Sequence, residues 1–314
     1  METIIEIKNL SKNYGEVAAV RELNLDVFKG ELFCLVGPDG AGKTTLVRML
    51  CGILKGYSGS YSIFNLEGSK NRNIIKNRIG YLSQKFSLYG DLTVDENINF
   101  FAKVHNIKEI KNKKDVLLTK MGIDKFGSRL AERLSGGMKQ KLALACTLIH
   151  SPDILFLDEP TTGVDPVSRR EFWQILADLK RNGITIFVTT PYMDEAERCD
   201  RVAFMYNGTI LSCDHPHRIK ENFKKKVMEV VCSPIREVYN FIKTLDRIES
   251  IHIFGDRLHL IFNELKITAE EIKQTLTQKA YDTANIRLIS PSLEDIFIMK
   301  VHELESKGVR ELRS

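Results

Sequence analysis

The segment GPDGAGKTT, Gly37 to Thr45, carries residue types that suit the binding of phosphate groups. It fits the pattern GxxxxGK[ST], follows the apolar run GELFCLVG and begins a helical pattern, which is the context that separates a P-loop from a chance glycine turn. Glycines let backbone N–H groups point inward at phosphate oxygens, and the helix N-terminus adds partial positive charge. We expect Lys43 to reach the β- and γ-phosphates of a nucleotide and the Thr44 hydroxyl to coordinate Mg²⁺.

The whole loop is the predicted nucleotide-binding segment. Its residues are Gly37, Pro38, Asp39, Gly40, Ala41, Gly42, Lys43, Thr44 and Thr45. Asp39 adds a negative charge to the loop, and we interpret its side chain as part of the turn, directed away from the phosphates.

The run ILFLDEP, Ile154 to Pro160, ends an apolar strand pattern with two carboxylates. We predict that Asp158 holds Mg²⁺ through water and that Glu159 polarises the attacking water as general base. Acidic residues at a strand end can also simply face solvent. The glycine loop upstream favours the functional interpretation, because parallel strands present their carboxyl ends on one edge of a sheet.

Short apolar runs alternate with helical patterns through the first part of the chain. GELFCLVG, DILFLDEP and ITIFVTT are each typical of a buried strand, which favours a parallel sheet in an α/β domain. From about Thr93 to Lys141 the pattern is helical and charged and indicates a helical insertion. We therefore predict a nucleotide-binding domain over residues 1–214, with a helical subdomain over about residues 90–141.

A second pattern follows Asp214. Residues 215–226 are typical of a connector, and residues 227–303 show strand and helix patterns in the order βαββαβ, which predicts a small α+β ferredoxin-like domain. Thr268 is the expected N-cap of one of its helices, and residues 304–314 form a terminal tail. Such a module suits dimer stabilisation, regulation or protection of a closed state equally well, since a fold does not assign a function.

The run LSGGMKQK, Leu134 to Lys141, is a second candidate anion site at a helix start. Alone this run could be a plain helix cap, but its place shortly before ILFLDEP favours the interpretation as an anion site. Together with SKNYG, GPDGAGKTT, YLSQ, TTGVDP and DEAERCDR in this order, it resembles the ATPase subunits of ATP-binding cassette (ABC) transporters over about residues 3–213. The resemblance implies a P-loop NTPase cassette with a RecA-like core and with antiparallel β and helical subdomains.

The resemblance also implies ATP and Mg²⁺ as cofactors and assigns further site residues. Tyr14 would stack on adenine, and Gln84 would sense Mg²⁺ and the attacking water while contacting the membrane partner. Ser135, Gly136 and Gly137 would grip the γ-phosphate of the nucleotide held by the opposite subunit, and Asp165 would lie in a loop that contacts the partner cassette. Met138 stands where glutamine is commoner.

More narrowly, FSLYGDLTVDENINFFA and PSLEDIF are similar to the drug- and polysaccharide-exporter branch, with its daunorubicin-type and multidrug efflux ATPases. Export as the direction of transport rests on this resemblance. It implies head-to-tail pairing with a second cassette and integral-membrane permease subunits as partners. The chain would be peripheral at the cytoplasmic face of the cell (inner) membrane. The alternatives are an ABC ATPase that acts on ribosomes or DNA and a regulatory ATP sensor with little hydrolysis.

The stretch FVTTPYMDEAERCD departs from the family at one position. Pro191 stands where the family has a histidine that contacts the γ-phosphate and the attacking water, and proline offers neither a side-chain donor nor an N–H group. A lost hydrogen bond to a charged group is worth roughly 1.5–3 kcal/mol, which predicts hydrolysis slowed by about one to two decades. We expect an asymmetric heterodimer with a second cassette that keeps its histidine, with a slow homodimer as the alternative.

Composition and charge argue against several other classes of protein. Basic and acidic residues number 46 and 41, and the net charge of +5 is too mild to indicate nucleic-acid binding. The local runs IKEIKNKKD and FKKK are expected to be solvated helix faces. The 6 cysteines form no CxxC pair and suit buried free thiols. METIIEIKNL lacks the apolar region of a secretory signal, and no apolar run approaches the ~18 residues that span a bilayer.

Overall fold

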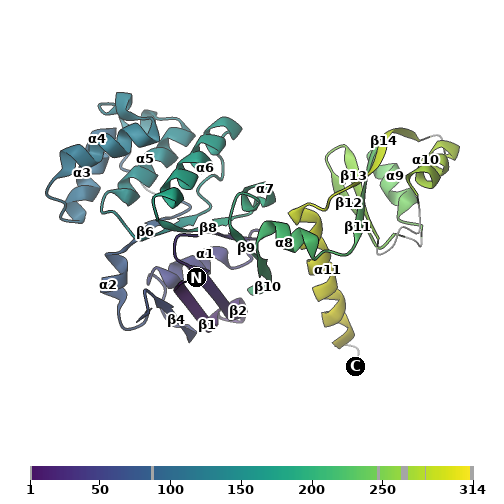
Figure 1. Cartoon of the computed structure of the whole chain (residues 1–314), viewed down its shortest axis with the longest axis horizontal. Coiled ribbons are helices and arrows are strands. Elements are labelled where there is room, and N and C mark those ends of the chain that lie inside the picture. Colours follow the sequence, from purple (N-terminus) through teal and green to yellow (C-terminus); the bar gives the residue numbers. More distant parts are fainter. Residues whose placement is uncertain (1, 86–87, 246–247, 263–267, 280, 312–314) are drawn as a thin grey trace. The chain divides into compact units, whose positions relative to one another are not determined.

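The structure is a computed structural model that describes residues 2–85, 88–245, 248–262, 268–279 and 281–311. The chain divides into two compact units, Met1–Asp214 and His215–Ser314 (Figure 1). Phe86 and Ser87 of the exporter-like motif, and the end of the strand pattern RLHLIFNE, lie outside the described residues.

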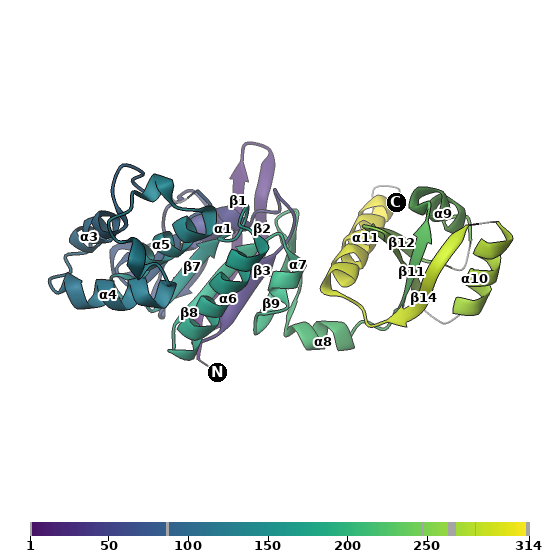
Figure 2. The same cartoon turned by 90° about the horizontal axis from the view of Figure 1, so that it is seen from above.

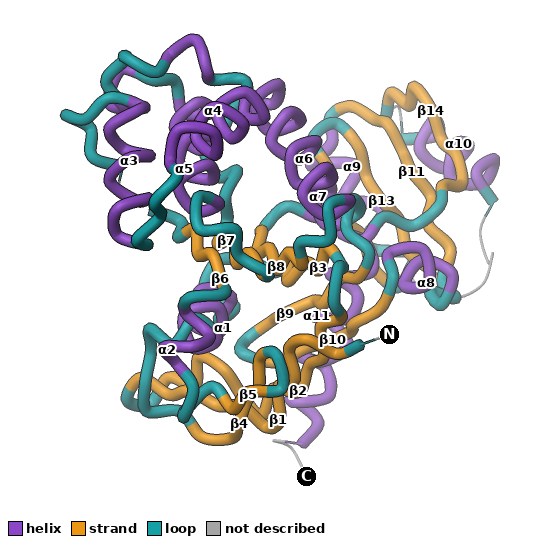
Figure 3. Tube along the Cα trace, turned by 60° about the vertical axis from the view of Figure 1, so that its left-hand side comes forward, coloured by secondary structure: helices purple, strands orange, loops and turns teal. Residues whose placement is uncertain are grey.

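The core of the first unit is a six-stranded sheet in the order β10-β9-β3-β8-β7-β6. Neighbours from β9 to β6 pair in parallel, and β10 pairs antiparallel with β9. The three apolar runs expected to be strands are strands, and every residue of β3, β7 and β8 is buried, as covered parallel strands require. Figure 3 shows β6, β7, β8 and β3 in succession. The strands are β3 (Leu32–Val36), β6 (Ile79–Leu82), β7 (Ile154–Asp158), β8 (Thr185–Thr190), β9 (Arg201–Tyr206) and β10 (Thr209–Asp214).

A second, antiparallel sheet has the order β2-β1-β4-β5. Helix α1 (Lys43–Leu50) packs Leu46, Val47 and Leu50 into one core with residues of both sheets. This packing fixes the helix that follows the glycine loop. The strands are β1 (Thr3–Tyr14), β2 (Val17–Phe28), β4 (Ser58–Ile63) and β5 (Leu66–Glu67), and the short helix α2 (Arg72–Lys76) follows β5.

Along the described chain, three α-helices follow β6 and precede β7: α3 (Val94–Val104), α4 (Ile110–Met121) and α5 (Gly136–Leu148). Thr93 caps α3 in a reciprocal capping box with Glu96. Between residues 88 and 148 the described backbone contains no strand beyond an isolated bridge. The 3₁₀ turns η1 (Asp124–Phe126) and η2 (Ala131–Arg133) connect α4 to α5, while α6 (Pro166–Arg181) and α7 (Met193–Ala196) flank β8 in sequence.

The second unit has the predicted order βαββαβ, followed by a long helix. Its antiparallel sheet has the order β12-β13-β11-β14. Thr268 caps α10 through a capping box with Glu271, which confirms the predicted cap. The elements are β11 (Lys226–Ser233), α9 (Ile235–Ile242), β12 (Ser250–Phe254), β13 (Arg257–Phe262), α10 (Ala269–Gln278), β14 (Asp282–Ile289) and α11 (Leu293–Glu311).

At the start of this unit the structure adds a helix to the expected connector and contradicts one expectation. The expected connector contains helix α8 (Pro216–Glu221), whose first position holds the proline that favours a helix start. The FKKK run is not a helix face, because Lys226 begins β11 and Lys225 forms ion pairs with Glu249 and Glu303. The other basic run does overlap a helix, α4.

The sheet of the second unit is covered on both faces. Met228 and Leu260 pack with residues of α9 and α10, whereas their neighbours Val227 and Ile261 pack against Met299 of α11. Figure 2 shows α11 on one side of this sheet and α9 and α10 on the other. Five of the cysteines of the whole chain are buried, Cys213 is half-buried, and all are free thiols. Among the described residues, no helix is long and apolar enough to cross a membrane.

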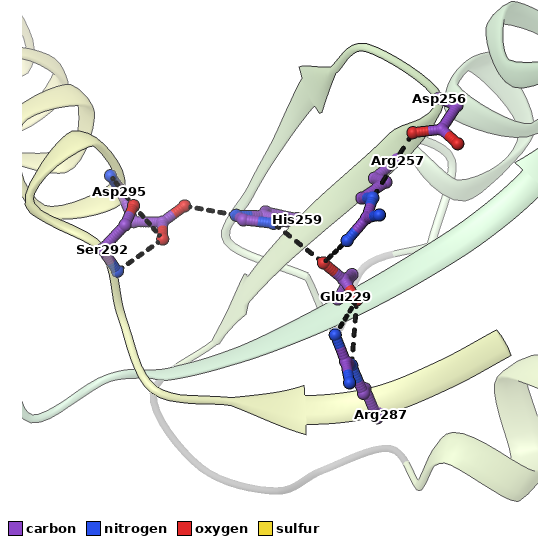
Figure 4. Close-up of polar contacts among 7 residues, drawn as sticks. All are labelled: Glu229, Asp256, Arg257, His259, Arg287, Ser292 and Asp295. Atoms are coloured by element: carbon purple, nitrogen blue, oxygen red, sulfur yellow. Dashed lines mark hydrogen bonds and ion pairs between the residues drawn. The ribbon is translucent and has the colours of Figure 1, made fainter. Parts of the chain in front are cut away.

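Polar side chains link α11 to this sheet (Figure 4). Glu229 pairs with Arg257 at 3.0 Å and with Arg287 at 2.9 Å, and the Nδ1 atom of His259 lies 2.7 Å from Asp295 Oδ1. Burial alone would raise the pKa of Asp295, but hydrogen bonds from His259 and Ser292 outweigh it and hold the pKa below its ordinary value. The buried carboxylate at the start of α11 therefore has the partners that a buried charge requires.

Candidate functional site

The glycine loop runs from β3 into α1 and leaves no room for side chains at two positions. A Cβ atom at Gly37 would overlap the carbonyl oxygen of Met205, and a Cβ at Gly42 would overlap that of Ala19. Gly40 and Gly42 also have positive φ angles of 79° and 105°, which glycine adopts without strain. Asp39 is exposed. The loop therefore forms the close backbone turn that a phosphate cradle needs, and the residues present fit such a group.

Lys43 bends over this loop. Its ammonium group donates hydrogen bonds to the carbonyl oxygens of Gly37 at 2.8 Å and Pro38 at 2.9 Å. The same group lies 3.0 Å from Glu159 Oε1, although Lys43 is only 3% exposed and Glu159 6%. In this buried setting the two charges compensate each other.

Asp158 is the last residue of β7 and lies beside the loop. Its Oδ1 atom accepts hydrogen bonds from the hydroxyls of Thr44 at 3.0 Å and Thr189 at 2.8 Å. Its Oδ2 atom is buried without a hydrogen-bond partner among the described residues. Burial raises the pKa of Asp158 despite the two hydroxyl donors. A carboxylate oxygen without a partner, next to a hydroxyl, is a donor set that suits Mg²⁺.

Glu159 follows Asp158 with a φ angle of 49°, which is uncommon for a residue other than glycine. Its N–H group donates to the carbonyl and the hydroxyl oxygen of Thr189, both at 3.1 Å. Its Oε2 atom accepts from the Nε2 atom of Gln84, which follows β6, at 2.9 Å. The carboxylate is thus held between Lys43 and Gln84 at the carboxyl edge of the sheet. Strained backbone of this kind persists where neighbouring contacts determine it.

Pro191 directly follows β8 and is half-buried. The residue before it, Thr190, accepts the N–H group of Gly37 through its carbonyl oxygen at 3.3 Å, so position 191 lies next to the start of the glycine loop. Proline brings no hydrogen-bond donor to this position.

The other predicted residues lie at the ends of elements. Tyr14 ends β1 and is 49% exposed, with the ammonium of Lys12 5.2 Å from its ring centre. Ser135 caps α5 and accepts the N–H group of Met138 at 3.3 Å. Asp165 caps α6 by accepting the N–H groups of Val167 and Ser168, and these hydrogen bonds lower its pKa.

Gly136 is exposed at the start of α5, whereas Gly137 is buried against Ser168 of α6. The structure therefore brings Lys43, Thr44, Gln84, Asp158 and Glu159 together. Ser135 and Asp165 instead have local contacts as helix caps.

Sequence reasoning missed two residues of this region. Thr189 binds both Asp158 and the backbone of Glu159, and the signal for it is the pair of threonines that ends the apolar run ITIFVTT. Glu195, within DEAERCDR, is completely buried beside the segment that follows Glu159. A carboxylate four residues after Pro191 could be noticed in the sequence, but its burial could not.

Comparisons with known proteins agree with this geometry. Residues 20–162 match the family described as ABC transporter, and residues 215–301 match the C-terminal domain of DrrA1-3-like ATP-binding proteins. The bacitracin transport ATP-binding protein BcrA of Bacillus licheniformis is 32% identical over 95% of this chain and 97% of its own length. The daunorubicin resistance ATP-binding protein DrrA2 of Streptomyces coeruleorubidus is 30% identical over 98% of both chains. This chain belongs to the ATP-binding proteins of ABC transporters.

A third relative of this ABC protein is longer. The probable multidrug ABC transporter ATP-binding protein YbhF of Escherichia coli (strain K12) is 43% identical over 70% of this chain, which spans only 38% of YbhF. Among solved structures, cbiO1 from Clostridium perfringens, part of the transporter complex cbiONQ, aligns with a TM-score of 0.63 and 27% identity, covering 79% of this chain and 97% of its own. The dimeric bacterial ABC transporter cassette MJ0796 aligns with a TM-score of 0.61 and 26% identity, covering 67% and 98%.

Proposed function

We propose that this chain is the ATP-hydrolysing subunit of an ABC exporter, with its nucleotide chemistry in residues 1–214. The observation that carries the proposal is the Glu159 carboxylate, held between Lys43 and Gln84 beside the unpartnered oxygen of Asp158. Relatives named for bacitracin transport, Nod factor export and daunorubicin resistance, each matched over 92% of its length or more, support export as the work that hydrolysis drives.

ATP binding would rearrange the contacts of Lys43. The ammonium group exchanges the carbonyl oxygens of Gly37 and Pro38, and the Glu159 carboxylate, for the β- and γ-phosphates. The exchange frees Glu159 Oε1 to take a proton from the attacking water, while Gln84 keeps the other oxygen oriented. Tyr14, exposed at the end of β1, stacks on the adenine.

Thr44, Asp158 and Gln84 would hold Mg²⁺, and Asp158 Oδ2 is a buried acceptor with no hydrogen-bond partner in the part of the chain that the structure describes. Bound there, the ion would neutralise the negative charge that develops on the phosphate oxygens. Thr189 keeps Asp158 Oδ1 in place through its hydroxyl.

The partners we infer are a second cassette and integral-membrane permease subunits. Ser135 and Gly136 are exposed at the start of α5, where backbone N–H groups favour an anion. With Gly137, they would bind the γ-phosphate held by the other cassette, and Asp165 would face that cassette. The chain then acts at the cytoplasmic face of the inner membrane, attached through its permease.

Pro191 attenuates this site in our proposal. A missing hydrogen bond to a charged group, roughly 1.5–3 kcal/mol, corresponds to hydrolysis slowed about 10- to 100-fold. An asymmetric pair with a cassette that keeps its histidine would retain one fast site, because Ser135 of this chain would still serve the partner's nucleotide. Copurification with a permease only as a homodimer, at full export rate, would contradict the asymmetric pair.

The test is the steady-state MgATP turnover of the full chain and of Pro191→His, with Glu159→Gln as the blank. We expect a wild-type rate just above the blank and a rise of tenfold or more with histidine. Pro191→Ala is the matched control, since it removes proline without adding a donor. A wild-type rate far above the blank that Pro191→His leaves unchanged contradicts the proposal that Pro191 slows hydrolysis. Rates at the blank for both wild type and Pro191→His contradict hydrolysis itself.

A further inference from the structure

We propose that Glu195 is a positioning residue for the hydrolysis described above, on which this inference rests. Glu195 lies in α7, four residues after Pro191, and is completely buried. Its carboxylate contacts three other segments, through Thr161, Thr190 and Arg169. Glu195 and these three residues are called the Glu195 clamp below.

Each carboxylate oxygen of Glu195 has its own threonine donor. The hydroxyl of Thr161 donates to Oε1 at 2.6 Å, and the hydroxyl of Thr190 donates to Oε2 at 2.5 Å. Arg169 Nε lies 3.4 Å from Oε1 and supplies the positive charge. The two hydroxyl hydrogen bonds are short, as is typical of hydrogen bonds to a carboxylate, and Arg169 lies within ion-pair distance without a hydrogen bond from Nε, so both buried carboxylate oxygens have partners.

The two threonines belong to the segments that carry the chemistry. Thr161 lies two residues after Glu159, and the turn between them includes a hydrogen bond from the Thr162 N–H to the Glu159 carbonyl oxygen at 3.3 Å. Thr190 directly precedes Pro191. Its carbonyl oxygen accepts the N–H group of Gly37, and its hydroxyl oxygen accepts the N–H group of Tyr192 at 3.1 Å. The Glu195 carboxylate therefore holds the backbone on both sides of the reacting groups at once.

The third contact extends the clamp to α6. The guanidinium of Arg169 lies 4.3 Å from the ring centre of Tyr192, the residue after Pro191. The preceding residue on α6, Ser168, packs against Gly137 at the start of α5. Gly137, Ser168, Arg169 and Glu195 thus form a continuous series of contacts from the start of α5 to the clamp.

The proline at position 191 gives the Glu195 clamp a larger part in holding the segment after β8. Proline offers no donor that could align the attacking water or tie the segment after β8 to Glu159. The Glu195 clamp supplies the second of these two functions, because its carboxylate accepts hydrogen bonds from both Thr161 and Thr190. A carboxylate serving only to fill the core would affect folding, whereas a positioning carboxylate affects kcat with little effect on the KM for ATP.

The experiment introduces Glu195→Gln into the wild-type chain and into Pro191→His, whose faster expected turnover makes a tenfold loss measurable, at saturating MgATP and across an ATP titration. Glutamine keeps the size of the side chain but removes its charge and one acceptor. We expect kcat to fall about tenfold or more and KM to stay within about twofold. Glu171→Gln is the matched control, since it removes a half-exposed carboxylate from α6 that pairs with Lys141 of α5 at 2.6 Å. The control should keep the wild-type kcat.

Two further measurements decide the inference whatever the turnover is. Thr161→Ser keeps the hydroxyl and should retain the wild-type kcat, whereas Thr161→Val should reproduce the loss in Glu195→Gln. Hydrogen exchange of the amides of Thr162 and Val164 in the nucleotide-free chain should accelerate in Glu195→Gln and stay unchanged in Glu171→Gln. Unchanged exchange together with an unchanged kcat overturns the clamp. A wild type without turnover contradicts the proposed hydrolysis, and the exchange rates then still decide the clamp.

Discussion

Replacing Gly137 by alanine tests how the start of α5 packs against α6. A Cβ atom there would overlap both Cβ and Oγ of Ser168. Overpacking of a close contact costs typically about 1–3 kcal/mol, whereas alanine gains only about 0.5–1 kcal/mol over glycine in a helix. The cost is larger than the gain, so we expect the free energy of unfolding to fall by roughly 1 kcal/mol. Urea denaturation of the full chain, followed by circular dichroism, measures it.

The neighbouring glycine is the control for this prediction. A Cβ at Gly136 would meet no atom within 4 Å, so Gly136→Ala should leave the unfolding midpoint unchanged or raise it. Ser168→Gly removes both overlapping atoms, so its cost should be smaller in the Gly137→Ala chain than in the wild type, with a coupling energy of about 0.5 kcal/mol or more. Equal midpoints for the two alanine variants, or equal costs of Ser168→Gly in the two chains, would refute the packing argument.

Two further predictions concern buried carboxylates. Thr189→Val removes a hydroxyl that lowers the pKa of Asp158, so the Mg²⁺ concentration for half-maximal ATP binding should rise about 3- to 10-fold, while Thr189→Ser stays near the wild type. Asp295→Asn should lower the free energy of unfolding at pH 7 by roughly 1.5–3 kcal/mol, because the hydrogen bond with His259 loses its charge. The folded pKa of Asp295 lies below its ordinary value of 3.8, so this stabilisation is present above pH 3.8 and is lost as the pH falls through the lower folded value. Urea denaturation from pH 7 to pH 3 should therefore show the difference between variant and wild type shrinking only in acid.

The buried strands and the caps were predictable from short stretches of sequence. β7 and β8 were recognisable because parallel strands covered on both faces are continuously apolar, and Thr268 because the Glu three residues later completes a capping box. Helix α8 was missed, since its six residues are too few to show a helical period and their polar composition suggested a connector.

The pairing of side chains from separate elements was not predictable. Lys43 was expected at the phosphates, and the structure adds its contact with Glu159, more than a hundred residues further along the chain. The role of Thr189 depends on the register between β7 and β8, which sets Asp158 opposite it. No local pattern encodes such a register, because it follows from how whole strands pack.

The same register determines where Pro191 lies relative to the glycine loop and Glu159. Val36, the last residue of β3, pairs with Thr190, and Asp158 pairs with Thr189, so three neighbouring strands end at one level. The glycine loop, Glu159 and Pro191 each follow such a strand end by one residue, and their backbones therefore meet at the same edge of the sheet. Under the proposal that Pro191 slows hydrolysis, the absent donor would lie within the site rather than beside it. In the proposed clamp, the carboxylate of Glu195 accepts hydrogen bonds from two of the three segments, through Thr161 and Thr190.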